Sequence, residues 1–186
     1  MVTHFYTTLT GTTSLITLEK AKKQLRIDAS MTDEDDLIQG YIDSAQEAVQ
    51  NFINRAIAKQ LLVMELNKFE SPLVFQFNYD NDTIAKIEYY APGETDLTLL
   101  PSDQYKLQKA SISECYAIKF YSTPETAERD DAVIVTISQG FTLAECPKPL
   151  LQAMQLRLSD FYERREDRDQ GNNPASNNLS RAYRKY

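Results

Sequence analysis

Several residue types that build common functional sites are scarce in this 186-residue sequence. Two cysteines and one histidine (His4) are too few for a disulfide scaffold or a Cys/His zinc site. Five glycines and no GxxxxGK[ST] motif give no sign of a phosphate-binding loop. Because GxSxG and HExxH motifs are also missing, we expect no nucleophilic catalytic site, no metal and no cofactor.

Long apolar segments are missing as well. No run approaches the roughly 20 apolar residues that a transmembrane helix needs. The first 20 residues carry neither the basic region nor the long apolar region of a signal peptide, so secretion is not expected. We therefore interpret Cys115 and Cys146 as buried, apolar residues of a protein made in a reducing cytoplasm.

The charges are distributed unevenly along the chain, whose net charge is -7. Residues 27–54 contain no Lys or Arg, whereas residues 170–186 contain bases and no acid. The acids of the first segment are Asp28, Asp33, Glu34, Asp35, Asp36, Asp43 and Glu47. The acidic total argues against general binding to a phosphate backbone. An acidic segment and a basic segment on one chain favour contacts between copies of the chain or with a partner protein.

Helical periodicity occurs near the N-terminus. Thr17 predicts the N-cap of a short helix that begins at the next residue. A second helix is predicted over about residues 33–58, where apolar residues recur at three- and four-residue intervals. Thr32 and Asp35 resemble a capping box at its start. Its apolar face is wide, so we expect it to be covered on more than one side.

A third helix is predicted after Pro147 and Pro149, because proline is tolerated in the first turn. Between the helical ends lie short runs rich in β-branched and aromatic residues, separated by turn sequences. We predict an α+β fold with an inserted antiparallel β block and an extended C-terminal tail. The predicted parts are an N-terminal extension (1–16), a helical core (17–59 with 147–169), the β block (60–146) and a docking tail (170–186).

The acidic stretch "DASMTDEDD" could be a metal site, a pair of catalytic carboxylates or the start of a helix. It does not match an EF-hand loop, which needs a central glycine and a final Glu. A carboxylate pair formed by Asp35 and Asp36 would need a cleft that raises a pKa, whereas a helix N-terminus favours the charged form. The same acids argue against a DNA-reading helix, since phosphates would repel them. Helix capping and a solvated acidic face are the favoured interpretation.

The C-terminal segment "LSRAYRKY" follows the linker-like composition "GNNPASNN". Arginine and tyrosine are common in binding hot spots, and such segments often become ordered on a partner. We therefore predict a partner-binding tail. Its candidate residues are Leu179, Arg181, Tyr183, Arg184 and Tyr186.

Four motifs occur in a recognisable order: "SLITLEKAKKQLRID", "DDLIQGYIDSAQEAVQNFINRAI", "CPKPLLQAMQLRLSDFYERRE" and "LSRAYR". Together they resemble the head–tail connector (head-completion adaptor) proteins of tailed bacteriophages. The matching residues of the first motif are Leu18, Lys22, Leu25, Arg26 and Asp28. Those of the second are Asp35, Asp36, Ile38, Tyr41, Ile42, Ala45 and Glu47. Those of the last two are Pro149, Ala153, Tyr162, Arg164, Arg165, Leu179, Tyr183 and Arg184.

This resemblance implies a structural virion protein without catalytic activity. It implies a twelvefold homo-oligomeric ring beneath the portal protein, which extends the DNA channel and meets the next head–tail protein, a stopper or tail terminator. DNA would pass without sequence-specific binding, and no membrane would be involved. The tail would reach the portal, and Asp33, Glu34, Asp35 and Asp36 would form a subunit contact or a channel rim. The protein would be made in the host bacterial cytoplasm and function at the head–tail interface.

Two alternatives remain open from the sequence. One is another neck or tail-completion protein of the tail-terminator type, which would have a similar helix-plus-sheet composition. The other is a carboxylate-dependent hydrolase that uses Asp35 and Asp36.

Overall fold

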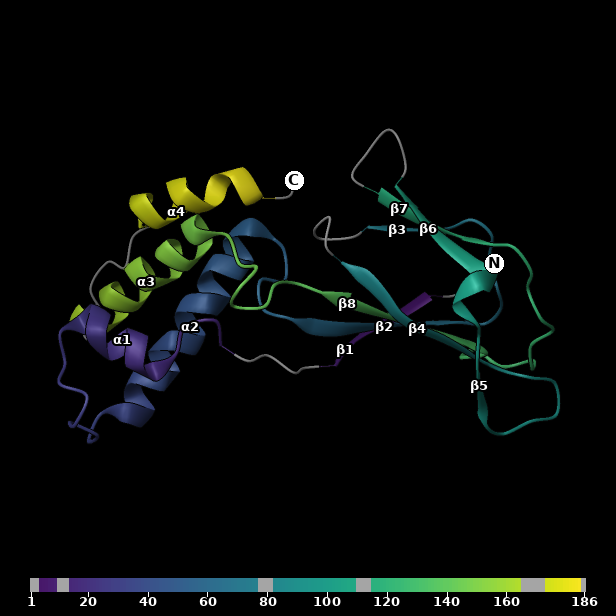
Figure 1. Ribbon diagram of the computed structural model, residues 1–186, viewed down its shortest axis with the longest axis horizontal. Coiled ribbons are helices and arrows are strands. Elements are labelled where there is room, and N and C mark those ends of the chain that lie inside the picture. Colours follow the sequence, from purple (N-terminus) through teal and green to yellow (C-terminus); the bar gives the residue numbers. More distant parts are fainter. Residues whose placement is uncertain (1–3, 10–13, 77–81, 110–114, 165–172, 185–186) are drawn as a thin grey trace. The chain divides into compact units, whose positions relative to one another are not determined.

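The computed structural model of the chain consists of two compact units and has the predicted α+β fold (Figure 1). One unit contains residues 1–11 and 59–140, and we call it the β unit. The other contains residues 12–58 and 141–186, and we call it the helical unit. The structure describes residues 4–9, 14–76, 82–109, 115–164 and 173–184.

Four helices and one 3-10 turn make up the described part of the helical unit. They are α1 (Leu18–Leu25), α2 (Asp35–Ile53), α3 (Lys148–Glu163), α4 (Pro174–Ser180) and η2 (Arg181–Tyr183). Helix α2 packs against α1, α3 and α4, so its wide apolar face is covered on more than one side, as predicted (Figure 1). The fully buried side chains along α2 and α3 include Ile38, Ile42, Ile53, Leu150, Met154 and Leu158.

The ends of the helices follow local capping chemistry. Thr17 caps α1 as predicted, because its hydroxyl accepts a hydrogen bond of 3.3 Å from the Lys20 N–H. The predicted capping box is wrong: α2 begins after Glu34, and no side chain caps it. Helix α2 also ends earlier than predicted, since Asn54 adopts a left-handed conformation with φ of 56° and its N–H returns to the Gln50 carbonyl.

The C-terminal segment differs from the predicted extended tail. Residues 174–183 form α4 and η2, and α4 packs along α3 and against α2 (Figure 1). The Asn173 side chain caps α4 by accepting from the Ser176 N–H at 2.8 Å, and Pro174 occupies the first turn. The same Asn and Pro that suggest a linker thus start a helix.

The β unit contains two antiparallel sheets. The first has the strand order β1–β2–β8–β4–β5, and the second has the order β3–β7–β6. The strands are β1 (His4–Leu9), β2 (Gln60–Leu66), β3 (Leu73–Gln76), β4 (Thr83–Tyr90), β5 (Leu97–Leu99), β6 (Tyr105–Lys109), β7 (Cys115–Phe120) and β8 (Val133–Gln139). Strand β1 pairs with β2, so part of the predicted N-terminal extension belongs to the sheet.

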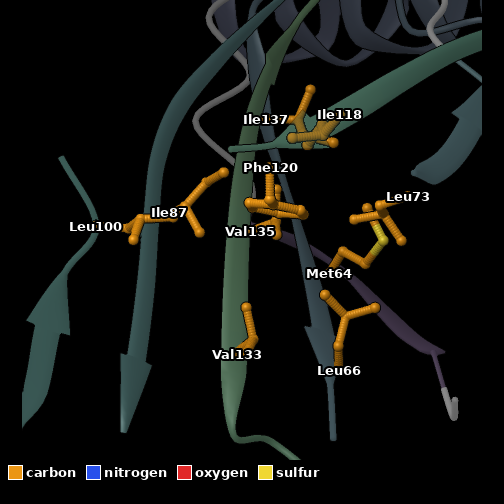
Figure 2. Packing of buried hydrophobic residues seen from close by; sticks show 10 residues of the cluster. All are labelled: Met64, Leu66, Leu73, Ile87, Leu100, Ile118, Phe120, Val133, Val135 and Ile137. Atoms are coloured by element: carbon orange, nitrogen blue, oxygen red, sulfur yellow. The ribbon is translucent and has the colours of Figure 1, made fainter. Parts of the chain in front are cut away.

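The apolar core of the β unit lies between the two sheets (Figure 2). Leu73, Ile118 and Phe120 come from the three-stranded sheet. They meet side chains of the five-stranded sheet and of the segment after β5, namely Met64, Leu66, Ile87, Leu100, Val133, Val135 and Ile137. Alternation along each strand points these residues inward and their neighbours outward.

Cys146 is buried in the helical unit, and burial raises the pKa of its thiol to about 12. This confirms its interpretation as an apolar residue, whereas the side chain of Cys115 lies outside the described residues. Within the described ranges, none of the helices has the length and apolar character needed to span a bilayer.

Candidate functional site

The acidic segment predicted to be functional forms the loop between α1 and α2 and the first turn of α2. Helix α1 ends at Leu25, and the C-cap residue Arg26 has a left-handed φ of 60° that turns the chain away from the helix. Asp28 then accepts two hydrogen bonds from Ser30, at 2.8 Å from the backbone N–H and at 2.6 Å from the hydroxyl. These bonds lower the pKa of Asp28 below its ordinary value. Asp28 is therefore a turn residue.

A buried lysine, named from the sequence only as a residue of the first motif, holds this loop. Lys22 on α1 has a side chain only 6% exposed, and its Nζ lies 2.5 Å from Oδ1 of Asp35. The same Nζ donates to the backbone carbonyls of Met31, at 2.7 Å, and Ala29, at 3.5 Å. The lysine thus satisfies several acceptors at once, as a buried charge requires. The sequence signal for this buried site was the position of Lys22 on the apolar face of the first predicted helix.

The structure divides the four predicted rim acids into two pairs. Asp35 is bound to Lys22, and Glu34 accepts a hydrogen bond of 2.7 Å from the hydroxyl of Tyr162 on α3. Asp33 and Asp36 are exposed, and neither makes an ion pair or side-chain hydrogen bond within the part of the chain that the structure describes. Asp33 and Asp36 are therefore the acids that remain available to a partner.

A pocket of about 340 Å³ opens beside these acids. Its apolar lining comes from Ile27, Met31, Ile38 and Tyr162, and its charged lining from Arg26, Asp28, Asp33 and Glu34. Met31 is 60% exposed, and Leu37 next to Asp36 is 42% exposed. We call Met31, Asp33, Asp36, Leu37 and this pocket the acidic pocket surface.

The arrangement gives little support to catalysis by Asp35 and Asp36. Asp35 is engaged by Lys22 and has a side chain 26% exposed, whereas Asp36 lies exposed on the first turn of α2. The described ranges contain no group of three or more His, Cys, Asp or Glu residues that could hold a metal ion. The two carboxylates therefore face different surroundings and do not share one site.

The predicted docking tail is attached to its own helical unit by small polar side chains. The Ser176 hydroxyl donates to the Ala153 carbonyl at 3.0 Å, and Arg157 donates to Oδ1 of Asn177 at 2.8 Å. The Asn173 amide donates to Asp160. Ser176 and Asn177 are buried, so α4 packs through a polar contact surface.

The predicted tail residues differ in their surroundings. Leu179 and Tyr183 are half-buried, whereas Arg181 and Arg184 are exposed. The Arg184 guanidinium carbon lies 5.0 Å from the centre of the Phe52 ring, a cation–π contact. Tyr186 lies outside the described residues. The structure therefore brings part of the predicted tail onto α2 and α3 and leaves the side chains of Arg181 and Arg184 exposed at the surface.

Comparison with known families finds a match over part of this chain. Residues 15–98 match the family of phage gp6-like head–tail connector proteins. The matched residues begin just before α1 and run through α2 into β5. This part of the chain is thus similar to structural proteins of the head–tail connector class. The match to the phage gp6-like connectors over these residues bears out the resemblance seen in the sequence.

Solved structures with a similar fold come from gene transfer agent (GTA) particles. A chain in the neck of an empty GTA particle, computed with C6 symmetry, has a TM-score of 0.68 and 15% identity. The match covers 98% of this chain and 96% of that chain. A chain of the native GTA virion gives a TM-score of 0.69 at 15% identity, over 97% and 95% of the two chains.

A third match is a chain in the neck of a native GTA particle computed with C12 symmetry. It has a TM-score of 0.62 at 14% identity, over 98% and 96% of the two chains. At these identities the likeness concerns the fold, and it extends over both units. No curated protein sequence matches the chain.

Proposed function

We propose that this chain forms a twelvefold ring in the neck of a phage-like particle, beneath the portal. There it extends the DNA channel and joins the head to the tail. The observation that carries the proposal is the connector-family match over residues 15–98. The similar chains from necks computed with C6 and C12 symmetry support a ring, and a twelvefold ring contains both symmetries.

In this role the chain is a scaffold and not an enzyme. Its partners are copies of itself, the portal and the next head–tail protein. DNA passes through the ring without being read, and the net charge of -7 favours such passage because acidic walls repel phosphates. Its place of action is then the virion, after synthesis in the host cell.

The C-terminal segment is the proposed contact with the portal. Arg181 and Arg184 are both exposed, and their positive charges suit an acidic partner surface; Arg184 also contacts the Phe52 ring of its own unit. Ser176 contacts α3 through a neutral hydrogen bond, which contributes about 1 kcal/mol, and the bond from the charged Arg157 to Asn177 contributes about 1.5–3 kcal/mol. Because these contacts are polar, a partner that offers equivalent hydrogen bonds can replace α3.

Electron microscopy of the assembled neck tests the ring. Particles would be purified with an affinity-tagged copy of this chain, and the tag would be located in the reconstruction. We expect a ring that contacts the portal on one side and the next neck protein on the other. A ring that caps the tail tube without touching the portal would instead establish a tail-terminator role.

The tail contact is tested by binding to the purified portal. Removal of residues 171–186 also removes α4, so Arg181→Glu with Arg184→Glu is the sharper variant. We expect this variant to lose portal binding. The matched control is Lys20→Glu with Lys23→Glu, which makes the same charge change on the exposed side of α1. Portal binding that survives both the deletion and the double reversal would refute the tail contact.

A further inference from the structure

The outer face of the three-stranded sheet in the β unit carries an unusual pair of lysines. Lys106 on β6 lies directly opposite Lys119 on β7 in the antiparallel register. Both side chains are exposed, and within the described ranges neither makes an ion pair or a hydrogen bond. Like charges directly opposite one another destabilise a sheet. The pair therefore has no structural benefit within its own sheet.

Exposed apolar side chains flank these lysines. Val74 on β3 pairs with Ala117, which lies two residues before Lys119 and hence on the same face. Tyr121 follows β7 two residues after Lys119, and its N–H donates to the Gln104 carbonyl at 2.8 Å. Val74 is 55% exposed and Tyr121 is 59% exposed. We call Val74, Lys106, Lys119 and Tyr121 the basic sheet face.

The opposite sides of the same strands show that this orientation is fixed. Ile118 and Phe120 alternate with Lys119 and point into the core between the sheets (Figure 2). A shift of one residue would bury the lysines and expose the core residues, so the register is strongly specified. The sheet therefore presents the basic sheet face outward as a rigid surface.

The acidic pocket surface of the helical unit has the complementary composition. It offers two unpaired acids, Asp33 and Asp36, where the sheet offers two unpaired lysines. It also has an apolar pocket of about 340 Å³, which falls at the lower end of the range for pockets that hold small ligands. Among the exposed large apolar side chains of the described residues, Tyr121 is the aromatic one. Aromatic side chains that enter pockets are typical interface anchors.

We propose that the basic sheet face of one copy binds the acidic pocket surface of the next copy in the ring. Tyr121 enters the pocket beside Met31, and Lys106 and Lys119 pair with Asp33 and Asp36. This contact rests on the ring of the proposed function and specifies its subunit interface. Two different surfaces of one chain form a heterologous contact, which is the kind of contact that closes a ring.

DNA is another anionic partner that two exposed lysines can bind. The exposed Val74 and Tyr121 favour a protein surface, because contacts with a phosphate backbone do not need apolar side chains. The matching number of unpaired charges on the two surfaces also favours a second copy. DNA binding becomes one outcome of the test below.

Charge reversal on both surfaces tests the contact in assembling particles that lack the wild-type chain. One variant carries Lys106→Glu with Lys119→Glu, and the other carries Asp33→Lys with Asp36→Lys. Each variant alone places like charges at every subunit contact, and we expect about a tenfold or greater loss of particles. When the two variants are produced together and alternate around the ring, every subunit contact pairs opposite charges. We expect particle formation to recover.

Matched variants separate this effect from folding defects. The double variant Lys20→Glu with Lys23→Glu carries the same charge change on α1, and Leu143→Ala removes an exposed apolar side chain that belongs to neither surface. We expect both to assemble normally, whereas Tyr121→Ala is expected to reduce assembly. Circular dichroism of each purified chain confirms that it is folded.

Cross-linking provides a readout that does not depend on particle yield. Tyr121→Cys in one tagged copy and Met31→Cys in another are expected to form an intermolecular disulfide within assembled necks. Normal assembly of the reversed variants with no such disulfide would overturn the interface and leave the connector function intact. Loss of assembly that the mixture does not rescue, together with weaker DNA retention for the lysine variant, would assign the lysines to DNA. Absence of the wild-type chain from the neck would overturn the proposed function itself.

Discussion

The two units of this chain hold their parts together by different means. The β unit closes two sheets over a continuous apolar cluster from which the charged neighbours point outward. The helical unit also has an apolar core, but its loop and its last helix are fixed by buried polar groups. Lys22 anchors the acidic loop, and Ser176 and Asn177 anchor α4.

This difference separates rigid parts from adjustable parts. Burial of apolar area depends on the whole shape of a core, so the sheets move as one body. A polar attachment can exchange its partner for water or for another protein at little net cost. The acidic loop and α4, which are expected to meet partners, are therefore attached by polar contacts. The basic sheet face lies on the closely packed β unit and is expected to be rigid.

The largest expected effect is in the β core. Phe120 lies between the sheets, and its ring centre is 5.1 Å from that of Phe69. Phe120→Ala leaves a cavity, and we expect the free energy of unfolding of the β unit to fall by about 3–5 kcal/mol. Hydrogen exchange of the β8 amides during urea titration measures it. Phe120→Leu is the control and should cost clearly less; equal losses for the two would argue against tight packing between the sheets.

A smaller effect is expected at the buried lysine of the helical unit. Lys22→Met removes the charge that Asp35 and two carbonyls contact. Because Asp35 is partly exposed, we expect a loss of about 2 kcal/mol in the stability of the helical unit rather than the full cost of breaking a buried pair. Hydrogen exchange of the α1 and α2 amides provides the measurement.

A double-mutant cycle with Asp35→Asn shows whether the pair acts as a unit. The two substitutions should be non-additive, since they remove the same ion pair. Additive losses, or an effect that reaches the β unit amides, would contradict the assignment of Lys22 as a local anchor of the loop.

The attachment of α4 should be weaker still. Asn173→Ala removes the cap of α4, and we expect the amides of residues 174–180 to exchange faster by an amount equivalent to about 1 kcal/mol. Exchange in α2 should stay unchanged. The matched control is Asn178→Ala, at an exposed position of the same helix. Equal effects of the two asparagines would mean that the cap does not hold the helix.

The smallest expected effect is a shift in one titration. Ser30→Ala removes a hydroxyl that donates to Asp28, so the pKa of Asp28 should rise toward its ordinary value. The lowered folded pKa stabilises the loop above the ordinary value of 3.8, and this stabilisation is lost as the pH falls through the folded pKa. NMR titration of the Asp28 carboxyl measures the change. Ser102→Ala in the β unit is the control and should leave that titration unaltered.

The helices and the β block could be predicted from the sequence because their signals are local. The spacing of Ile38, Ile42 and Val49 predicts α2. Thr17 predicts the cap of α1 because it stands immediately before a segment with helical spacing. The end of α2 at Ile53 was missed, since apolar residues continue to Ala58 and only the left-handed Asn54 breaks the helix.

Contacts between distant residues explain the remaining differences. The pair Lys22–Asp35 depends on a turn that brings residues 13 positions apart together, and charge patterns alone do not reveal such a turn. The composition of the tail suggested a linker because serine and asparagine are frequent in turns. In the structure those short side chains suit the close approach of α4 to α3, where Ser176 reaches a backbone carbonyl. The basic sheet face also went unnoticed, since Lys106 and Lys119 become neighbours only through the strand register.

The short edge strand β5 has a consequence for the free subunits. The five-stranded sheet is open, and β5 forms one of its edges with only the three residues Leu97–Leu99. Exposed edges invite uncontrolled addition of further strands, and a very short edge limits this hazard. The β5 edge thus offers little length for strands of another copy to add to, which limits edge-to-edge growth on that side of the sheet.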